Sequence, residues 1–233
     1  MRSWRGTGLA LVALAVAAVC VRLGVWQLDR LRERRTRNAA IVARREAPPL
    51  DIVGRVPADS VWQRVVRVTG VLDYTAERVW PGRTVEGVPG VAILTPLRLA
   101  DGTAVFVDRG WVPSPDARRV DLGRARERDT VTVGGLGLRA PRAAGDVDPA
   151  ALADSLPYPI APFVVQWLPA ASAYADSPLP VRRWPAPVLD DGPHLFYAIQ
   201  WLAFAAIALG GMVAVVREGR RGRAPEEGRG LTL

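Results

Sequence analysis

The sequence predicts a membrane protein in which two transmembrane α-helices flank an antiparallel β-rich extracytoplasmic domain, either a sandwich or a small barrel. Residues 195–216 carry no charge. At about 1.5 Å per residue they extend about 33 Å, which is enough to cross a bilayer core of about 30 Å. Residues 9–28, nearer the N-terminus, form the first apolar stretch of the chain, which is interrupted by Arg22. The predicted parts are a cytoplasmic tail (1–8), a membrane helix (9–28), an Arg-rich helical extension (29–46), the β-rich domain (47–193), a membrane helix (194–216) and a basic cytoplasmic tail (217–233).

Composition argues against nucleic-acid binding, an intrachain disulfide and a zinc site. The net charge is +8, and every basic residue is Arg, which suggests a compositional bias of the genome. Much of the positive excess lies beside the apolar stretches, where Arg is expected to contact lipid headgroups, so we expect membrane lipid as a partner and no nucleic acid. Cys20 is the only cysteine and His194 the only histidine. An intrachain disulfide is therefore impossible, and a zinc site made by the protein alone is not expected.

The first apolar stretch is expected to be a retained helix; the alternative is a cleaved signal peptide. Arg22 has two interpretations: it reaches the membrane interface with its long side chain, or it pairs with an anionic ligand group or with Asp190 or Asp191. The Arg-rich residues 29–46 either extend this helix into water or lie along the surface, and Pro48-Pro49 ends them.

The middle of the chain has the pattern of short β-strands. β-Branched residues alternate in part, and Ala100-Asp101-Gly102 is a strong hairpin signal between two apolar runs. Glycines and a proline predict a loop over residues 83–90, and recurring prolines predict extended or looping chain over residues 141–187. The expected strands are residues 61–70, 91–99, 103–112, 130–138 and 163–168.

Charge predicts the orientation only in part. Arginines beyond residue 216 place the C-terminus in the cytoplasm, whereas those after residue 28 outnumber Arg2 and Arg5 and favour the opposite orientation. Two spans put both termini on one side. Because charges beside a large translocated domain are less decisive, we follow the second helix and expect both termini in the cytoplasm.

His194 stands at the expected entry of the second helix into the membrane, directly after Pro193. Helical spacing places His194, Tyr197 and Trp201 on one side of the first two turns. Tyr and Trp are common at membrane interfaces, and a lone interfacial histidine is more often incidental than a ligand. Haem is nevertheless one ligand that suits such a histidine, because it is flat and largely apolar and needs an axial nitrogen.

Several motifs resemble the surfeit locus protein 1 family of cytochrome c oxidase assembly factors. Their order and their placement around the two apolar stretches cover nearly the whole chain. Each motif alone is weak, but together they are specific. They are LGVWQLDR (23–30), VVRVTG (65–70), GVPG (87–90), LTPL (94–97), DG (101–102), VDRGWVP (107–113) and GPHLFYAIQW (192–201).

The resemblance implies a two-span protein of the bacterial plasma membrane whose β-rich domain lies on the outer side. It implies a role in assembling haem-copper oxidases and a transient complex with haem a, with the oxidase catalytic subunit and the haem a synthesis enzymes as partners. His194 matches the family histidine implicated in haem binding and becomes the expected axial ligand of the haem iron. Tyr197, Trp201 and Trp26 are expected to pack on the ring, and Arg22 or Arg30 to offset the propionates.

Two departures from the family pattern affect local hydrogen bonding. Asp108 stands where many relatives have Asn, and residues 190–193 replace an Asn-containing approach to His194. Arg109 is expected to form a structural ion pair or to stack on Trp111; its functional alternative is a contact with a propionate or with the oxidase. Trp26 is an interfacial anchor, a helix-packing residue or a flank of a haem ring held between the helices.

Three other functions compete with this hypothesis. A haem-modifying enzyme is not expected, because the chain has no Ser-His-Asp set, histidine cluster, P-loop or Rossmann glycine pattern. A scaffold that binds oxidase subunits without a cofactor remains the main alternative. An extracytoplasmic sensor fits the two-span layout, but few residues follow the second helix and they form no output domain.

Overall fold

The structure is a computed structural model that describes residues 2–141, 147–169 and 181–221, with side chains from residue 6 to residue 218. The chain divides into two compact units, a helical unit (Met1–Ala39 and Leu189–Leu233) and a barrel unit (Ala40–Val188). Parts of the proline-rich stretch (142–146 and 170–180) and most of the C-terminal tail (222–233) lie outside the described residues.

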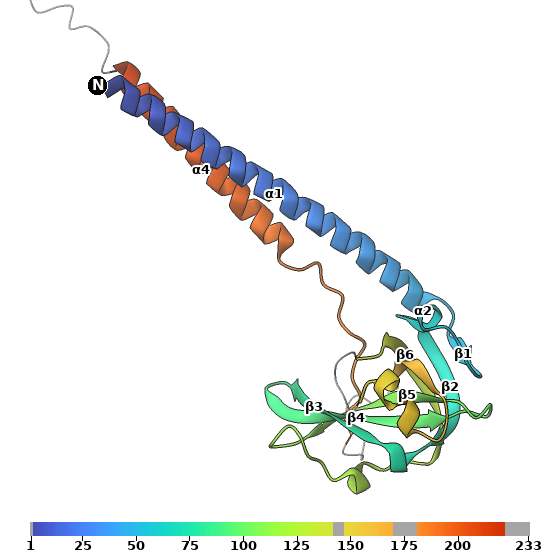
Figure 1. The fold of residues 1–233 in the computed structure, drawn as a ribbon. Helices are drawn as coiled ribbons and strands as arrows, with labels where there is room; N and C mark the ends of the chain where they lie inside the picture. Colours follow the sequence, from blue (N-terminus) through green and yellow to red (C-terminus); the bar gives the residue numbers. More distant parts are fainter. Residues whose placement is uncertain (1, 142–146, 170–180, 222–233) are drawn as a thin grey trace, which may run out of the picture. The chain divides into compact units, whose positions relative to one another are not determined.

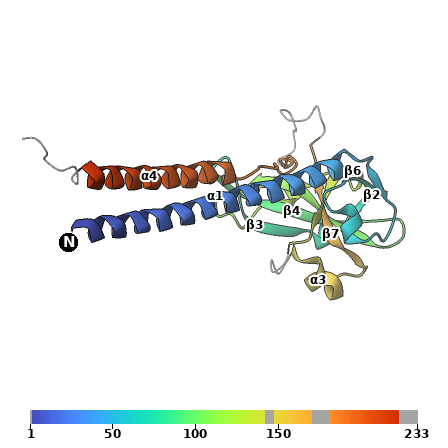
Figure 2. The same cartoon turned by 90° about the horizontal axis from the view of Figure 1, so that it is seen from above.

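The helical unit pairs two long helices. Helix α1 (Arg2–Glu46) is continuous, so the Arg-rich residues 29–46 extend the first apolar stretch, and it ends just before Pro48-Pro49. Helix α4 (His194–Arg221) begins directly after Pro193. Both are long and apolar enough to cross a membrane, judged by length and composition. Figures 1 and 2 show them side by side, and the pairs of residues in contact make them antiparallel.

The barrel unit is built on one seven-stranded sheet. Its strand order is β1-β2-β6-β7-β5-β4-β3, and an additional pairing of β2 with β4 closes β2, β6, β7, β5 and β4 into a small barrel (Figure 1). Short helical turns connect the strands: α2 (Ala58–Val61), η1 (Tyr74–Ala76), η2 (Leu122–Ala125), α3 (Pro149–Leu152) and η4 (Ala153–Ser155). The strands are β1 (Leu50–Ile52), β2 (Val65–Leu72), β3 (Arg78–Val85), β4 (Val88–Arg98), β5 (Ala104–Pro113), β6 (Thr130–Arg139) and β7 (Ile160–Trp167).

The barrel confirms one of the two predicted architectures, but the sheet is not purely antiparallel. Strand β7 lies between β6 and β5, antiparallel to the first and parallel to the second, and β1 pairs with β2 in parallel. Alternation of apolar residues indicates that a segment is a strand, but it does not indicate whether the neighbouring strand is parallel or antiparallel. The prediction of an all-antiparallel sheet was therefore wrong at these two pairs.

The predicted loop over residues 83–90 was also wrong. The structure forms a hairpin there, with β3 ending at Val85 and β4 starting at Val88. Gly82 and Gly87 both have positive φ, the first at an irregularity of the β3–β4 ladder and the second in the turn. Glycines that indicated a loop instead provide the left-handed conformations of a bulged hairpin.

The barrel core and the segments that cover it explain why strands β4 and β5 are buried on both faces. Residues 104–112 of β5 are all buried, because one face points into the barrel and the other is covered by residues of η2 and of segment 181–184. The interior cluster comprises Ile52, Val61, Val66, Val68, Leu72, Leu97, Leu99, Val105, Val107, Val133, Phe163 and Val165.

Candidate functional site

A regular seam joins the two helices of the helical unit. Buried or partly buried side chains recur every three or four residues on both helices, the spacing of a coiled-coil contact. Small residues dominate, which lets the two backbones approach closely. A Cβ added to Gly24 would lie 3.1 Å from the Leu202 side chain. The seam consists of Ala17, Cys20, Gly24, Gln27 and Leu31 on α1, and of His194, Ala198, Trp201, Ala205 and Ala208 on α4.

His194 is a member of this seam. Its Nδ1 atom lies 2.9 Å from Oε1 of Gln27, across the interface between the helices. An amide oxygen only accepts hydrogen bonds, so we assign the proton to Nδ1. In the neutral imidazole the lone pair then lies on Nε2. This tautomer can bind a metal ion through Nε2.

Gly192 keeps the other edge of the imidazole open. Its φ of +69° lies in the left-handed region. A Cβ at this position would lie 3.3 Å from Cδ2 and 3.4 Å from Nε2 of His194. A side chain at residue 192 would therefore crowd the nitrogen that is free to act as a ligand.

Polar and charged side chains of α1 bind Asp190 and Asp191, the acidic residues that precede His194. The Arg34 guanidinium donates hydrogen bonds to the carboxylate of Asp190 at 3.1 Å and to the backbone carbonyl of Asp190 at 3.2 Å. Asn38 donates to the same carbonyl at 2.8 Å, and Arg35 binds the Asp191 carboxylate at 2.8 Å. The acidic pair thus contacts the Arg-rich extension, and the structure pairs it with Arg34 and Arg35 rather than with Arg22.

The other predicted site residues lie around this seam. Trp201 is in the seam, whereas Tyr197 lies on its flank and is largely exposed, with its ring edge-on to Phe196. Trp26 is also exposed, and the guanidinium of Arg30 lies 5.8 Å from its ring centre. Arg30 forms an exposed ion pair with Glu33.

Arg22 is exposed on α1. The structure therefore brings His194 and Trp201 together in the seam and places Tyr197, Trp26, Arg30 and Arg22 on exposed faces of the same unit.

The sequence reasoning missed Gln27, Gly192, Arg34 and Asn38. Gln27 carries a signal that could have identified it, because it is a polar residue at helical spacing between Gly24 and Leu31. The basic extension and the acidic pair are also complementary in charge. Neither signal specifies which residues meet across the helices.

In the barrel unit, the VDRGWVP motif forms a buried polar network. Arg109 is the extra residue of a bulge in the β4–β5 ladder and is fully buried. Its guanidinium binds Glu77 at 2.6 Å and Glu127 at 2.9 Å, donates to the backbone carbonyl of Ala125, and lies over the ring of Tyr74. The predicted structural ion pair is confirmed, and the predicted stack on Trp111 was wrong because the ring beneath Arg109 is that of Tyr74.

Asp108, beside Arg109, is also buried. Its Oδ1 accepts hydrogen bonds from the backbone N–H of Gly110 at 2.9 Å and from the Trp184 indole at 3.2 Å. Burial raises the pKa of Asp108 to about 6, against the smaller lowering effect of these bonds and of Arg83 and Arg183. Asp108 thereby connects the barrel to segment 181–184.

Comparisons with known proteins point to one family. The model of the SURF1 family matches residues 14–206. An uncharacterised SURF1-like protein of Mycobacterium bovis is 29% identical, over 93% of this chain and 86% of its own length. A SURF1-like protein of Monosiga brevicollis is 31% identical, but the match spans only 58% of this chain and 56% of that protein. One from Rickettsia felis is 28% identical over 43% of this chain and 45% of its own length.

Proposed function

The chain belongs to the SURF1 family, and on this premise we propose that it is an assembly factor for haem-copper oxidase that binds haem a and assists its insertion into the catalytic subunit. We place it in the bacterial plasma membrane, with α1 and α4 as spans, the barrel unit outside and both termini in the cytoplasm. Haem a is cargo in this proposal, and the protein carries out no reaction of its own.

The observation that carries the proposal is the hydrogen bond between His194 and Gln27. With the proton on Nδ1, the lone pair of Nε2 is available to a metal ion, which supports the proposal. Gly192 leaves space at that nitrogen. The residues present therefore fit a haem, which needs one axial nitrogen beside apolar surface.

Each nearby side chain has a defined task in this proposal. His194 donates the Nε2 lone pair to the iron, and Gln27 holds the ring in orientation. Trp201, Tyr197 and Trp26 offer aromatic surface, and Arg22 and Arg30 offer positive charge for propionates. The farnesyl tail would lie in membrane lipid. Transfer of the cargo requires reversible binding, for which a single exchangeable ligand is suited.

The proposal is tested by complementation. A host that lacks its own SURF1-family protein receives the wild-type gene, the His194→Ala variant or the Gln200→Leu variant, whose altered residue is exposed on α4. The haem a content of the purified oxidase is then measured per copper. We expect full content with the wild type and with Gln200→Leu, and a strong loss with His194→Ala. Full content with His194→Ala would instead favour a scaffold that needs no cofactor.

A further inference from the structure

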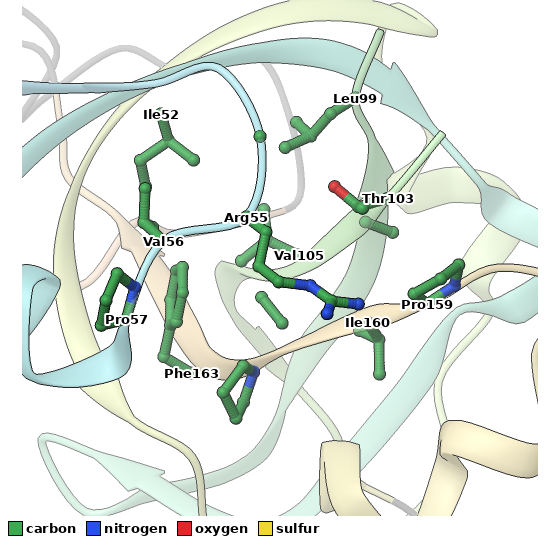
Figure 3. A pocket seen from close by; sticks show the side chains of 14 residues that line it. Ile52, Arg55, Val56, Pro57, Leu99, Thr103, Val105, Pro159, Ile160 and Phe163 are labelled. Carbon is green, nitrogen blue, oxygen red and sulfur yellow. The ribbon is translucent and has the colours of Figure 1, made fainter. Parts of the chain in front are cut away.

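A hollow of about 610 Å³ opens at one end of the barrel, where β1 ends and β5 and β7 begin (Figure 3). Its walls come from three segments of the barrel unit, within residues 52–57, 99–105 and 159–163. The volume falls within the range of about 300–1,000 Å³ that is typical of small-molecule sites. The candidate haem ligand His194 belongs to the other unit, so this hollow is a separate feature.

The hollow exists because the ladder between β5 and β7 is irregular. Ala104 pairs with Ile160, and the next pair is Phe106 with Val164. One residue of β5 therefore stands opposite three residues of β7, and β7 bows away from its neighbour. Buried side chains of the barrel interior form the floor of this gap, because Ile52, Leu99, Val105 and Phe163 both line the hollow and belong to the interior cluster.

One charged side chain reaches into this apolar space. Among the described residues that line the hollow, Arg55 is the only charged one, and its side chain is exposed. Figure 3 shows its guanidinium extending across the hollow toward Ile160 and Pro159. It forms no hydrogen bond or ion pair with any residue in the described part of the chain.

Asp101 is the acidic residue that interacts electrostatically with Arg55, and it already accepts hydrogen bonds from another residue. Asp101 accepts hydrogen bonds from the hydroxyl of Thr103 at 2.7 Å and from its backbone N–H at 3.0 Å. These bonds, with a smaller contribution from Arg55, lower the pKa of the Asp101 carboxyl. Arg55 thus remains available to a second anion at the edge of the hollow.

The walls favour a molecule with few polar groups. Pro57, Pro159 and Pro162 line the hollow, and proline has no backbone N–H to donate. A bound peptide would bring backbone amides that need hydrogen-bond partners, and these walls provide few. An acyl chain has no such requirement, and its single carboxylate matches the single guanidinium.

We propose that this hollow binds an amphipathic carboxylate of the medium-chain fatty acid class, with the acyl chain inside the barrel end and the carboxylate on Arg55. The proposal is independent of haem binding, because it uses residues of the barrel unit alone.

The test uses the full chain reconstituted in lipid nanodiscs. A dodecanoic acid with a terminal diazirine is added, photolysed and located by mass spectrometry of peptides. We expect labelled peptides that contain Val105 or Phe163, and competition by dodecanoate but not by dodecanol. Equal labelling of these peptides by the methyl ester of the probe would overturn the proposal, since the ester has no charge for Arg55.

Two variants and a control sharpen the test. Arg55→Gln removes the charge and is expected to reduce labelling of these peptides about tenfold, the effect of losing a charge-assisted hydrogen bond. Val56→Trp fills the hollow from its rim and is expected to abolish labelling of these peptides. Arg128→Gln changes an exposed arginine elsewhere in the barrel unit and should leave labelling unchanged. Wild-type labelling in Arg55→Gln, with unchanged thermal unfolding, would contradict the proposed site even if Val56→Trp failed to fold.

Discussion

The Nδ1 atom of His194 lies 2.9 Å from Oε1 of Gln27, so residues 167 positions apart in the sequence orient a single imidazole. The bond also joins the start of α4 to α1, which places the candidate ligand at the seam and not on a freely exposed face. The consequences of this relationship can be measured.

Replacing Gln27 tests whether the hydrogen bond supports ligand binding. Gln27→Leu removes the acceptor, so the imidazole loses its fixed tautomer and orientation. Loss of such a supporting partner typically weakens metal binding by about 10–100-fold. We expect at least a tenfold weaker retention of haem a, measured by titration with apomyoglobin as the acceptor.

Two further variants control this prediction. Gln27→Glu keeps an acceptor and is expected to retain haem a better than Gln27→Leu. Gln200→Leu alters an exposed glutamine of α4 and should behave as the wild type. Equal retention in Gln27→Leu and Gln200→Leu would show that the bond does not support binding.

Gly192 provides a second test of the same site. Gly192→Ala places a Cβ about 3.4 Å from Nε2 and puts a non-glycine residue at φ +69°, a conformation that costs about 1–2 kcal/mol. We expect weaker haem a binding by about tenfold, the equivalent of about 1.4 kcal/mol. The matched variant Gly210→Ala lies inside α4, where an added Cβ meets no atom within 4 Å. Identical spectra and affinities for both variants would refute the role given to Gly192.

Arg109 is predicted to stabilise the barrel unit. Arg109→Ala leaves the carboxylates of Glu77 and Glu127 buried with one partner fewer, and such a loss typically costs about 3–5 kcal/mol. Thermal unfolding followed by near-ultraviolet circular dichroism should therefore occur at a much lower temperature. Arg128→Ala, at an exposed arginine, should change stability by less than about 0.5 kcal/mol. Similar unfolding temperatures for the two variants would contradict a structural role for Arg109.

Asp108 predicts a pH dependence with a definite sign. Its pKa rises from 3.8 to about 6 on folding, so the folded protein holds this proton more tightly than the unfolded chain does. The contribution of Asp108 to stability therefore decreases as pH rises from about 4 to about 6, and the resulting penalty remains above pH 6. Two pKa units correspond to about 3 kcal/mol, which we take as an upper limit.

The matching variant is Asp108→Asn, which keeps an acceptor for the Trp184 indole but carries no charge. We expect a higher unfolding temperature than the wild type at pH 7.5 and little difference at pH 4. Asp116 serves as a control of opposite sign, because hydrogen bonds from the backbone N–H groups of Arg119 and Arg118 lower its pKa to about 2. Asp116→Asn should lower the unfolding temperature at pH 7.5. A destabilising Asp108→Asn at that pH would show that the charged carboxylate is favourable.

Much of the fold could be predicted because its signals are local. The uncharged run after His194 has the length and composition of a spanning helix, and α4 begins at that residue. The Asp101-Gly102 turn joins β4 and β5 as expected. Both features depend on residues close together in the sequence.

The errors in the fold arise where a local signal has two structural outcomes. Pro89 and Gly90 indicated a loop, yet both lie in β4. Gly90 is needed there because a Cβ would overlap the side chain of Trp111 on the neighbouring strand. That requirement comes from tertiary packing and cannot be recognised from the order of residues alone.

The candidate site could be predicted only in its central residue. His194 was identifiable as the single histidine at the start of an apolar helix, but its partner Gln27 depends on the register between two helices far apart in sequence. The same holds for the contacts of Arg34 and Arg35 with the acidic pair. Helical spacing specifies which residues share a face and leaves open which faces meet.

The most direct test of the central claim is the visible absorption spectrum of the purified full-length protein, produced together with the haem a synthesis enzymes. We predict a reduced haem a band in the wild type and in Gln200→Leu, and its loss or shift in His194→Ala at equal protein yield. An unchanged haem a band in His194→Ala would contradict ligation by this histidine, and the lack of haem in all three proteins would contradict haem binding itself.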